Sequence, residues 1–301
     1  MGAGLSDTRH AFGSAETERK LACLKDYLTH FSVALKSQNF ARLYIDAFAG
    51  TGSRTETRAA LPFFGEGEDE TATEVTTPGS ARIALETMPA FHSVVLIEQD
   101  PSKVKALESV LAEYPSVGAQ VREGDANDIV QKICRKYDWH RERIRGVIFL
   151  DPYGMEVSWE TVTAVAETKA LDCWYFFPLS GLYRNAPRDV LALDPGKIAS
   201  LNRVLGTDEW QTDWYEGRDD YPDLFGEVRP DRRRVADVDR IEEWVHNRLR
   251  SVFQGTVLKP LRLKHSNGAP MASLFFAVSN PNKAAVGLAT RIASHILKAG
   301  I

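Results

Sequence analysis

The sequence predicts an α/β protein with a mostly parallel sheet and helices on both faces. Short apolar runs alternate with segments of helical period over residues 16–180, as in parallel sheets with right-handed crossovers. The first apolar run ends in Asp46, and a Gly-x-Gly turn, Gly50 to Gly52, follows it. Three later strand ends also finish in an acid. Ligands of open α/β sheets bind at the carboxyl ends of the strands, so we expect the site there.

Size and composition limit the classes of protein. The chain has 301 residues, 44% hydrophobic and 26% charged, enough for one large domain with an insertion. The net charge of -4 gives no strong basic field for nucleic acid. Three widely spaced cysteines have no zinc spacing, so we predict no metal site and a reduced, cytoplasmic protein. No apolar run approaches a membrane span, and the polar start has no signal-peptide core.

The core is predicted over residues 16–180. Residues 1–15 are small and polar, and we expect a disordered tail. A first helix follows, since apolar side chains recur at helical spacing at Leu21, Leu24, Leu28, Phe31 and Leu35. We then expect five strands, at about 42–47, 93–97, 119–121, 146–150 and 172–177. Helices are predicted to begin near Ser80 and to span about 101–114, 126–137 and 158–168.

Two segments interrupt the alternation of strands and helices. Residues 53–77 are acidic and rich in threonine, which predicts a mobile loop, either a disordered insertion or a lid over the ligand. Residues 181–255 are predicted to form a helical insertion that serves as a substrate or partner region. Its basic cluster, 229–234, lies downstream of several aromatic residues and either holds nucleic acid or is a solvated loop. Residues 256–301 should complete the core with two strands and a helix.

The glycine turn distinguishes two classes of ligand. A dinucleotide fingerprint has a third glycine and runs into a helix whose N-terminus holds pyrophosphate. Here no third glycine follows Gly52, and the next helix is expected far downstream, so a ligand without phosphate is favoured over a nicotinamide cofactor. S-adenosylmethionine fits, because the Asp46 carboxylate would meet its cationic amino group.

The acids at the next strand ends suit a nucleoside. Glu98 has lone pairs for both ribose hydroxyls, and Asp125, followed by Ala126, suits the adenine amine. Simpler alternatives remain for both residues. Glu98 would then be a solvated loop acid, and Asp125 would be the N-cap of the following helix.

These motifs together resemble those of class I S-adenosylmethionine-dependent methyltransferases. The resemblance is carried by Asp-x-Phe-x-Gly-x-Gly at 46–52, Glu98, the turn 124–126 and the turn 151–153. More narrowly, the chain resembles the three-Cys-motif partner (TcmP) family at 44–52, 149–154, Asp172 and 275–280. The resemblance implies a Rossmann-like fold with a seven-stranded sheet and association with a three-cysteine-motif protein. It also implies that S-adenosylmethionine is bound by Asp46, Phe48, Ala49, Gly50, Gly52, Glu98, Gln99, Asp125 and Ala126.

The turn Asp151-Pro152-Tyr153-Gly154 carries the reaction hypothesis. In amino-methyltransferases an Asp/Asn-Pro-Pro-aromatic turn holds a planar amine, and the aromatic ring stacks on the base. This chain lacks the second proline and is closer to the Asp-Pro-Phe-Gly turn of tRNA guanine N2-methyltransferases. We therefore expect methyl transfer to a nitrogen of a nucleobase or nucleic acid, with Asp151, Pro152 and Tyr153 orienting the acceptor. Two alternatives remain: a turn that only ends its strand, with Tyr153 beneath the cofactor, and a partner protein that keeps the fold but transfers no methyl group.

Overall fold

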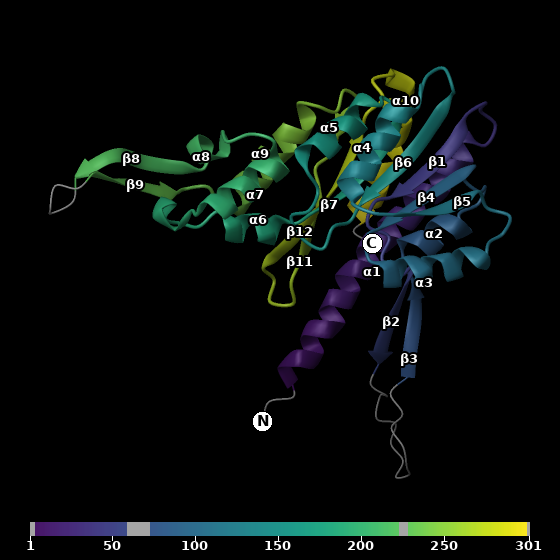
Figure 1. The fold of residues 1–301 in the computed structure, drawn as a ribbon, viewed down its shortest axis with the longest axis horizontal. Coiled ribbons are helices and arrows are strands. Elements are labelled where there is room, and N and C mark those ends of the chain that lie inside the picture. The colour runs from purple at the N-terminus through teal and green to yellow at the C-terminus, as the bar shows by residue number, and fades with distance from the viewer. Residues whose placement is uncertain (1–3, 59–72, 223–227, 300–301) are drawn as a thin grey trace, which may run out of the picture.

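The computed structural model describes residues 4–58, 73–222 and 228–299, which form a twisted sheet between two layers of helices (Figure 1). The strands of the sheet are β1 (Ala41–Asp46), β4 (Ser93–Glu98), β5 (Ala119–Glu123), β6 (Ile144–Leu150), β7 (Leu171–Phe177), β10 (Thr256–Val257), β11 (Leu261–Lys264) and β12 (Pro270–Val278). The helices are α1 (Gly4–Leu35), α2 (Ser80–Glu86), α3 (Pro101–Ala112), α4 (Ala126–Lys136), α5 (Trp159–Glu167), α6 (Leu179–Asn185), α7 (Pro195–Leu205), α8 (Trp210–Asp213), α9 (Val238–Arg250) and α10 (Lys283–Ala299). Among the described helices, none combines the length and the apolar character needed to cross a membrane.

The order of the strands confirms the predicted fold class. The strand order across the sheet is β10-β12-β7-β6-β1-β4-β5. Within this order the five strands β7, β6, β1, β4 and β5 are parallel to one another. Strand β12 is antiparallel to β7 and lies between it and β10. The chain winds outward from β1 in one direction through β4 and β5, and in the other through β6 and β7. This Rossmann-like arrangement has its switch point between β1 and β6, where ligand crevices form in such sheets.

Both faces of the sheet are covered, which explains the near-continuous apolar strands. On one face α1, α2, α3 and α10 pack against side chains such as Tyr44, Phe149 and Trp174. On the other face α4, α5, α7 and α9 pack against alternate residues of the same strands, such as Ile45 and Ile148. The two clusters are the two halves of a doubly wound core, and they hold the carboxyl ends of the strands in one rim.

Three boundaries differ from the sequence prediction. Helix α1 begins at Gly4, so it takes in most of the expected disordered tail. The predicted loop 53–77 begins and ends in an antiparallel hairpin, β2 (Ser53–Arg58) with β3 (Thr73–Pro78), and its middle, 59–72, lies outside the described residues. The expected strand 256–264 is split into β10 and β11, both paired with β12, because the segment between them holds Pro260, which has no N–H for the ladder.

The insertion is only partly helical. After α6, a 3-10 turn (Val190–Ala192), α7 and α8, it forms the hairpin β8 (Tyr215–Pro222) with β9 (Val228–Arg234), which carries the basic cluster. This hairpin extends away from the core at one end of the molecule, while β2–β3 and the first turns of α1 both project downward in the view of Figure 1. Neither strand of the β8–β9 hairpin has an alternating apolar pattern in the sequence, so the period of a half-buried strand is missing there.

Ser279 connects the antiparallel strand to the start of β7. Its buried hydroxyl donates to Leu171 O at 2.7 Å and accepts from Leu171 N at 3.0 Å. We expect Ser279→Ala to lower the free energy of unfolding by about 2 kcal/mol, because a buried N–H loses its acceptor. Urea denaturation would measure this. The control is Ser109→Ala, which removes an exposed hydroxyl bonded to its own helix and should stay within about 0.5 kcal/mol. Equal effects of the two substitutions would contradict the assignment.

Candidate functional site

A cavity of about 320 Å³ opens at the carboxyl ends of β1, β4 and β5. It joins the segment after β1, the β4–α3 turn, the start of α4, the loop after β6 and one residue of α7. The lining residues are Ala47, Phe48, Ile97, Glu98, Gln99, Asp100, Lys103, Gly124, Asp125, Ala126, Asn127, Tyr153, Glu156 and Arg203. Six residues that the sequence predicted for the site therefore line one cavity: Phe48, Glu98, Gln99, Asp125, Ala126 and Tyr153.

The glycine turn has the backbone conformation that the sequence predicted. Gly50 has φ +62° and Gly52 has φ +75°, both in the left-handed region that favours glycine. A side chain at Gly52 would also lie 3.1 Å from Leu107 Cδ2 of α3. Ala49 N donates to Ile97 O at 2.9 Å, which ties the turn to β4. After Gly52 the chain enters β2 and not a helix; α2, which begins at Ser80, contacts the turn through Gly79 N, which donates to Gly52 O at 3.1 Å.

Glu98 binds the glycine turn to the turn that follows β4. Its Oε2 accepts from Gly50 N at 3.1 Å, and its Oε1 accepts from Gln99 N and Asp100 N, each at 3.0 Å. The residue is buried. It is therefore not the solvated loop acid of the simpler alternative. Each carboxylate oxygen has two lone pairs, so Glu98, which already accepts three hydrogen bonds, keeps one lone pair, on Oε2, for a donor in the cavity.

Asp125 is the N-cap of α4, as the simpler alternative proposed, and it also lines the cavity. Its Oδ1 accepts from Asp128 N at 3.0 Å, while its side chain stays exposed. The buried Ala126 begins the helix beside it. The two interpretations are compatible, because capping uses one oxygen and leaves the other facing solvent.

Asp46 lies in the core next to the cavity and is not among the lining residues. It is 0% exposed, and its carboxylate accepts from Tyr44 Oη at 3.3 Å and Phe48 N at 3.4 Å. Burial raises the pKa of Asp46 to about 7; the Ser80 hydroxyl lowers it, and the charge of Asp151 raises it further. Asp46 and Asp151 are thus electrostatic neighbours at the switch point. Meeting a ligand's amino group would require Asp46 to become accessible.

Asp151 forms an ion pair that the sequence analysis missed. Lys20 Nζ of α1 lies 2.7 Å from Asp151 Oδ1 and 2.6 Å from Oδ2, and it stands 4.2 Å from the centre of the Phe176 ring. The side chain of Lys20 is only 8% exposed. The signal in the sequence was a lysine within the apolar stripe of the first helix. An ammonium on a carboxylate beside an aromatic ring occupies the position that we expected for the acceptor amine.

Tyr153 projects from the loop between β6 and α5. It is 82% exposed, and Lys103 Nζ lies 4.8 Å from the centre of its ring. The loop is held from two sides. Asn127 Nδ2 donates to Glu156 O at 3.0 Å, and Arg203 donates to the same oxygen at 2.7 Å and also to Met155 O. Arg203 comes from the insertion, and only the tertiary fold brings it to the rim.

The other residues that the sequence predicted for the site do not line the cavity. Gly50, Gly52 and Ala49 form the turn without lining the cavity, and Pro152 is buried between Asp151 and Tyr153. Among the described residues, no group of three or more His, Cys, Asp or Glu side chains is arranged to hold a metal ion.

Comparisons with known proteins identify the class of fold. No family model matches the chain, and no curated protein matches it in sequence. Among solved structures, protein LPL1258 of Legionella pneumophila, from the family model DUF519, is similar with TM-score 0.50 and 13% identity over 91% of each chain. The N-terminal domain of EvdMO1 with SAH bound is similar with TM-score 0.39 and 10% identity, covering 85% of this chain and 80% of that one. The first likeness supports the α/β fold seen here.

Substitution of Lys20 should leave the Asp151 carboxylate without its partner and so lower the stability of the folded protein. We expect Lys20→Met to lower the free energy of unfolding by about 3 kcal/mol, because Asp151 would stay largely buried without its partner. Adding Asp151→Asn should recover part of the loss, giving a coupling of about 2 kcal/mol in a double-mutant cycle measured with urea. Exposed Lys25→Met on the same helix is the control. Strict additivity of the two substitutions would contradict the ion pair.

Stability should depend on pH through Asp46. The folded state keeps the Asp46 proton up to a pH of about 7, whereas the unfolded state releases it near the ordinary value of about 4. The unfolded state therefore binds fewer protons in this window, and stability falls as the pH rises through it, by about 1 kcal/mol per pH unit. Asp46→Asn should have a pH profile shallower by that amount in urea unfolding between pH 5 and 7. Parallel profiles would show that Asp46 is already ionised when folded.

Proposed function

We propose that this protein is an S-adenosylmethionine-dependent methyltransferase that acts on a nitrogen of a nucleobase or nucleic acid. The observation that carries the proposal is the contact between Glu98 and Gly50 N at the carboxyl ends of β1 and β4. It fixes the glycine turn beside an acid at the end of the neighbouring strand. A nucleoside with a short cationic side chain suits such a turn better than a pyrophosphate does.

The cavity offers separate contacts for the parts of the cofactor. Glu98 would accept from one ribose hydroxyl with the remaining lone pair of Oε2, and Asp125 with Ala126 would face the adenine edge. Phe48 and Ile97 supply apolar surface to the same cavity. The turn formed by Ala49, Gly50 and Gly52 would bring backbone close to the amino-acid part, near Asp46. When bound, the cofactor supplies an electrophilic methyl group on its sulfonium.

The loop after β6 would orient the acceptor. Tyr153 presents an exposed ring on which a flat base can stack, and stacking of this kind tolerates every base. Asp151, at the end of β6, would accept a hydrogen of the acceptor amine and direct the nitrogen lone pair. Pro152 fixes the backbone between the two side chains. Arg203 and Asn127 hold the loop and so fix the separation between base and carboxylate.

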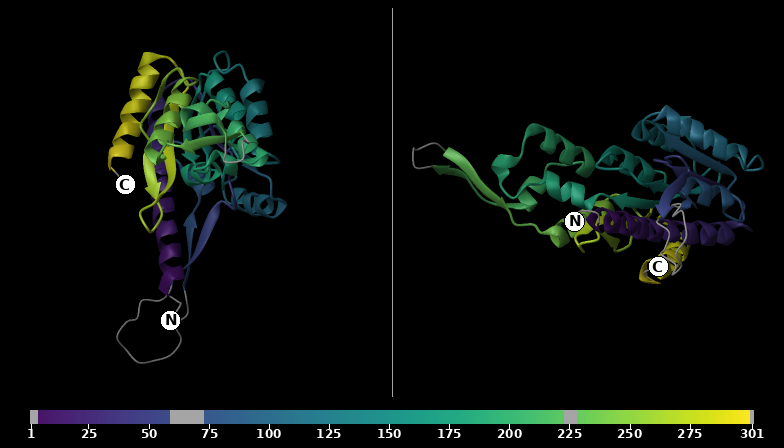
Figure 2. Two further views of the ribbon diagram at one scale, coloured as in Figure 1. Left: turned by 90° about the vertical axis from the view of Figure 1, so that its left-hand side faces the viewer. Right: turned by 90° about the horizontal axis from the view of Figure 1, so that it is seen from below.

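A second candidate function rests on the Lys20–Asp151 ion pair. If the ammonium of Lys20 stays on Asp151, the acceptor carboxylate is occupied, and the fold acts as a partner protein for a three-cysteine-motif protein without methyl transfer. The projecting hairpins and the first turns of α1 would then form the binding surface (Figure 2). The two functions differ in whether Asp151 contributes to turnover or only to stability.

Calorimetry tests the cofactor. We expect the protein to bind S-adenosylmethionine and not NAD. Glu98→Gln should weaken the binding by about 1–3 kcal/mol, because a ribose hydroxyl loses its carboxylate acceptor. Glu123→Gln is the matched control: Glu123 lies at the same register of the next strand and is exposed, so affinity should not change. Binding of NAD alone, or equal affinities of the two variants, would reject the proposal.

Methyl-transfer assays with tRNA, ribosomal RNA and DNA test the reaction. We expect Asp151→Asn to lower kcat by about 100-fold while the affinity for S-adenosylmethionine stays within about twofold, because the residue acts on the acceptor. Exposed Asp208→Asn should retain full activity. If no acceptor is methylated by a protein that binds the cofactor, and Asp151→Asn still binds a three-cysteine-motif protein, the partner function replaces the enzyme.

A further inference from the structure

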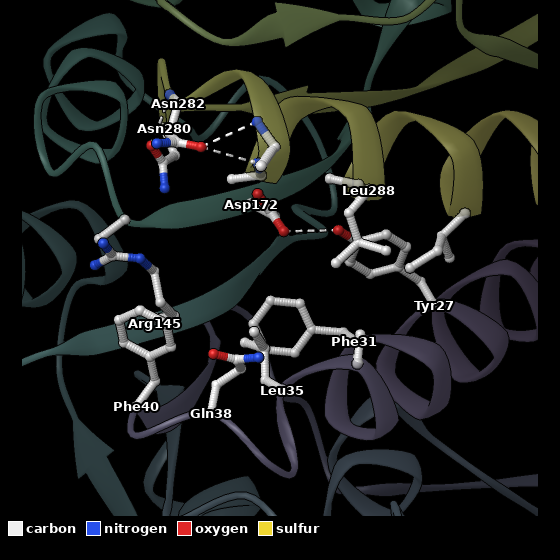
Figure 3. Close-up of a pocket in the computed structure, with 16 residues that line it drawn as sticks. Tyr27, Phe31, Leu35, Gln38, Phe40, Arg145, Asp172, Asn280, Asn282 and Leu288 are labelled. Carbon is white, nitrogen blue, oxygen red and sulfur yellow. Dashed lines mark hydrogen bonds between the residues drawn. The ribbon is translucent and has the colours of Figure 1, made fainter.

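A second cavity, of about 380 Å³, opens at the opposite edge of the sheet, where the parallel strands begin. Figure 3 shows that α1 and α10 form its helical walls, while residues at the starts of β6 and β7 and beyond the end of β12 form its sheet side. None of its lining residues belongs to the site at the carboxyl edge. It is therefore a separate pocket with its own chemistry.

Two buried polar residues of this cavity have unused hydrogen-bonding atoms. Asp172 is 9% exposed, and its Oδ2 accepts from Tyr27 Oη at 2.6 Å, while its other oxygen accepts from no residue in the described part of the chain. Asn280 is 8% exposed, and its Oδ1 accepts from Asn282 N at 2.9 Å; its amide nitrogen donates to none of the described residues. Both residues line the cavity, so these atoms offer one acceptor and one donor to a ligand there.

Arg145 adds a further donor to the same side. Its Nη1 donates to Ile144 O at 2.7 Å, and its guanidinium lies 4.8 Å from the centre of the Phe40 ring. Burial raises the pKa of Asp172 to about 7, while the hydrogen bond from Tyr27 and the charge of Arg145 lower it. One cation and one acid thus nearly balance, which favours a ligand without net charge.

The other walls are flat and apolar. Tyr27 and Phe31 of α1 contribute rings, and Leu288 and Ile292 of α10 face the cavity from the other helix. Aromatic walls with a few polar groups at one side select a planar molecule and fix its orientation. The volume of about 380 Å³ is sufficient for a single ring system.

We propose that this cavity binds a small, neutral, planar heterocycle that carries an N–H donor beside a carbonyl oxygen, as in an oxopurine base. The ring N–H donates to the free oxygen of Asp172. The carbonyl accepts from the Asn280 amide, and the ring packs between Phe31 and Leu288. The site is independent of the proposed cofactor, since the two cavities lie at opposite ends of the strands.

The test uses hypoxanthine as the probe and the full chain, with S-adenosylhomocysteine added to occupy the carboxyl-edge site. Saturation-transfer NMR and calorimetry should give a Kd of about 1 mM or tighter for hypoxanthine. Indole, which has the N–H and the flat shape but no carbonyl, should bind at least tenfold more weakly. No binding of hypoxanthine, or equal binding of the two probes, would overturn the proposal.

Two substitutions locate the probe. Asp172→Asn places an amide donor where the acceptor was and should weaken binding at least tenfold. Asn280→Asp keeps the acceptor for Asn282 N but removes the amide donor to the carbonyl of the probe. This substitution should also weaken binding at least tenfold. Asn267→Asp is the matched control, since Asn267 Oδ1 accepts from Ala269 N at 3.0 Å in an exposed turn. Circular dichroism would verify folding; should Asp172→Asn unfold, Asn280→Asp decides the outcome. Unchanged hypoxanthine affinity in the folded variants contradicts the site, whether or not the chain binds S-adenosylhomocysteine.

Discussion

The carboxylate of Glu98, with three backbone N–H donors from two separate turns, is the contact on which the rim of the sheet depends. A buried carboxylate is costly without donors, and turns with left-handed glycines leave N–H groups without helix or sheet partners. In this structure the N–H groups of the two turns donate to the buried carboxylate of Glu98, so both kinds of group have partners. The result is that Gly50 and the start of α3 keep a fixed separation, and the cavity between β1, β4 and β5 keeps its shape.

Helix α1 is held to the sheet by two acids at opposite edges. Lys20 pairs with Asp151 at the carboxyl edge, and Tyr27 donates to Asp172 at the amino edge. The two residues are seven positions apart, about two helical turns, so they lie on the same face of the helix. This helix therefore lines the cavity at the amino edge and forms an ion pair with the loop after β6 at the carboxyl edge.

The core and the projecting elements have different physical origins. The doubly wound core buries both faces of the sheet, and its side chains fix where each strand ends. The hairpins β2–β3 and β8–β9 extend from it (Figure 1). Their ladders are local antiparallel pairs. None of the residues that line the cavity at the carboxyl edge belongs to these two hairpins.

The sequence by itself determined the fold class, the order of the core elements and the rim residues Glu98, Asp125 and Tyr153, because apolar period and glycine conformation are local properties. It could not determine the hairpin β8–β9, whose strands lack an apolar face, or the split of the last edge strand into β10 and β11. Only the tertiary structure paired Lys20 with Asp151, brought Arg203 to the loop after β6 and buried Asp46. Those three features depend on contacts between residues far apart in the chain, and local sequence patterns do not indicate such contacts.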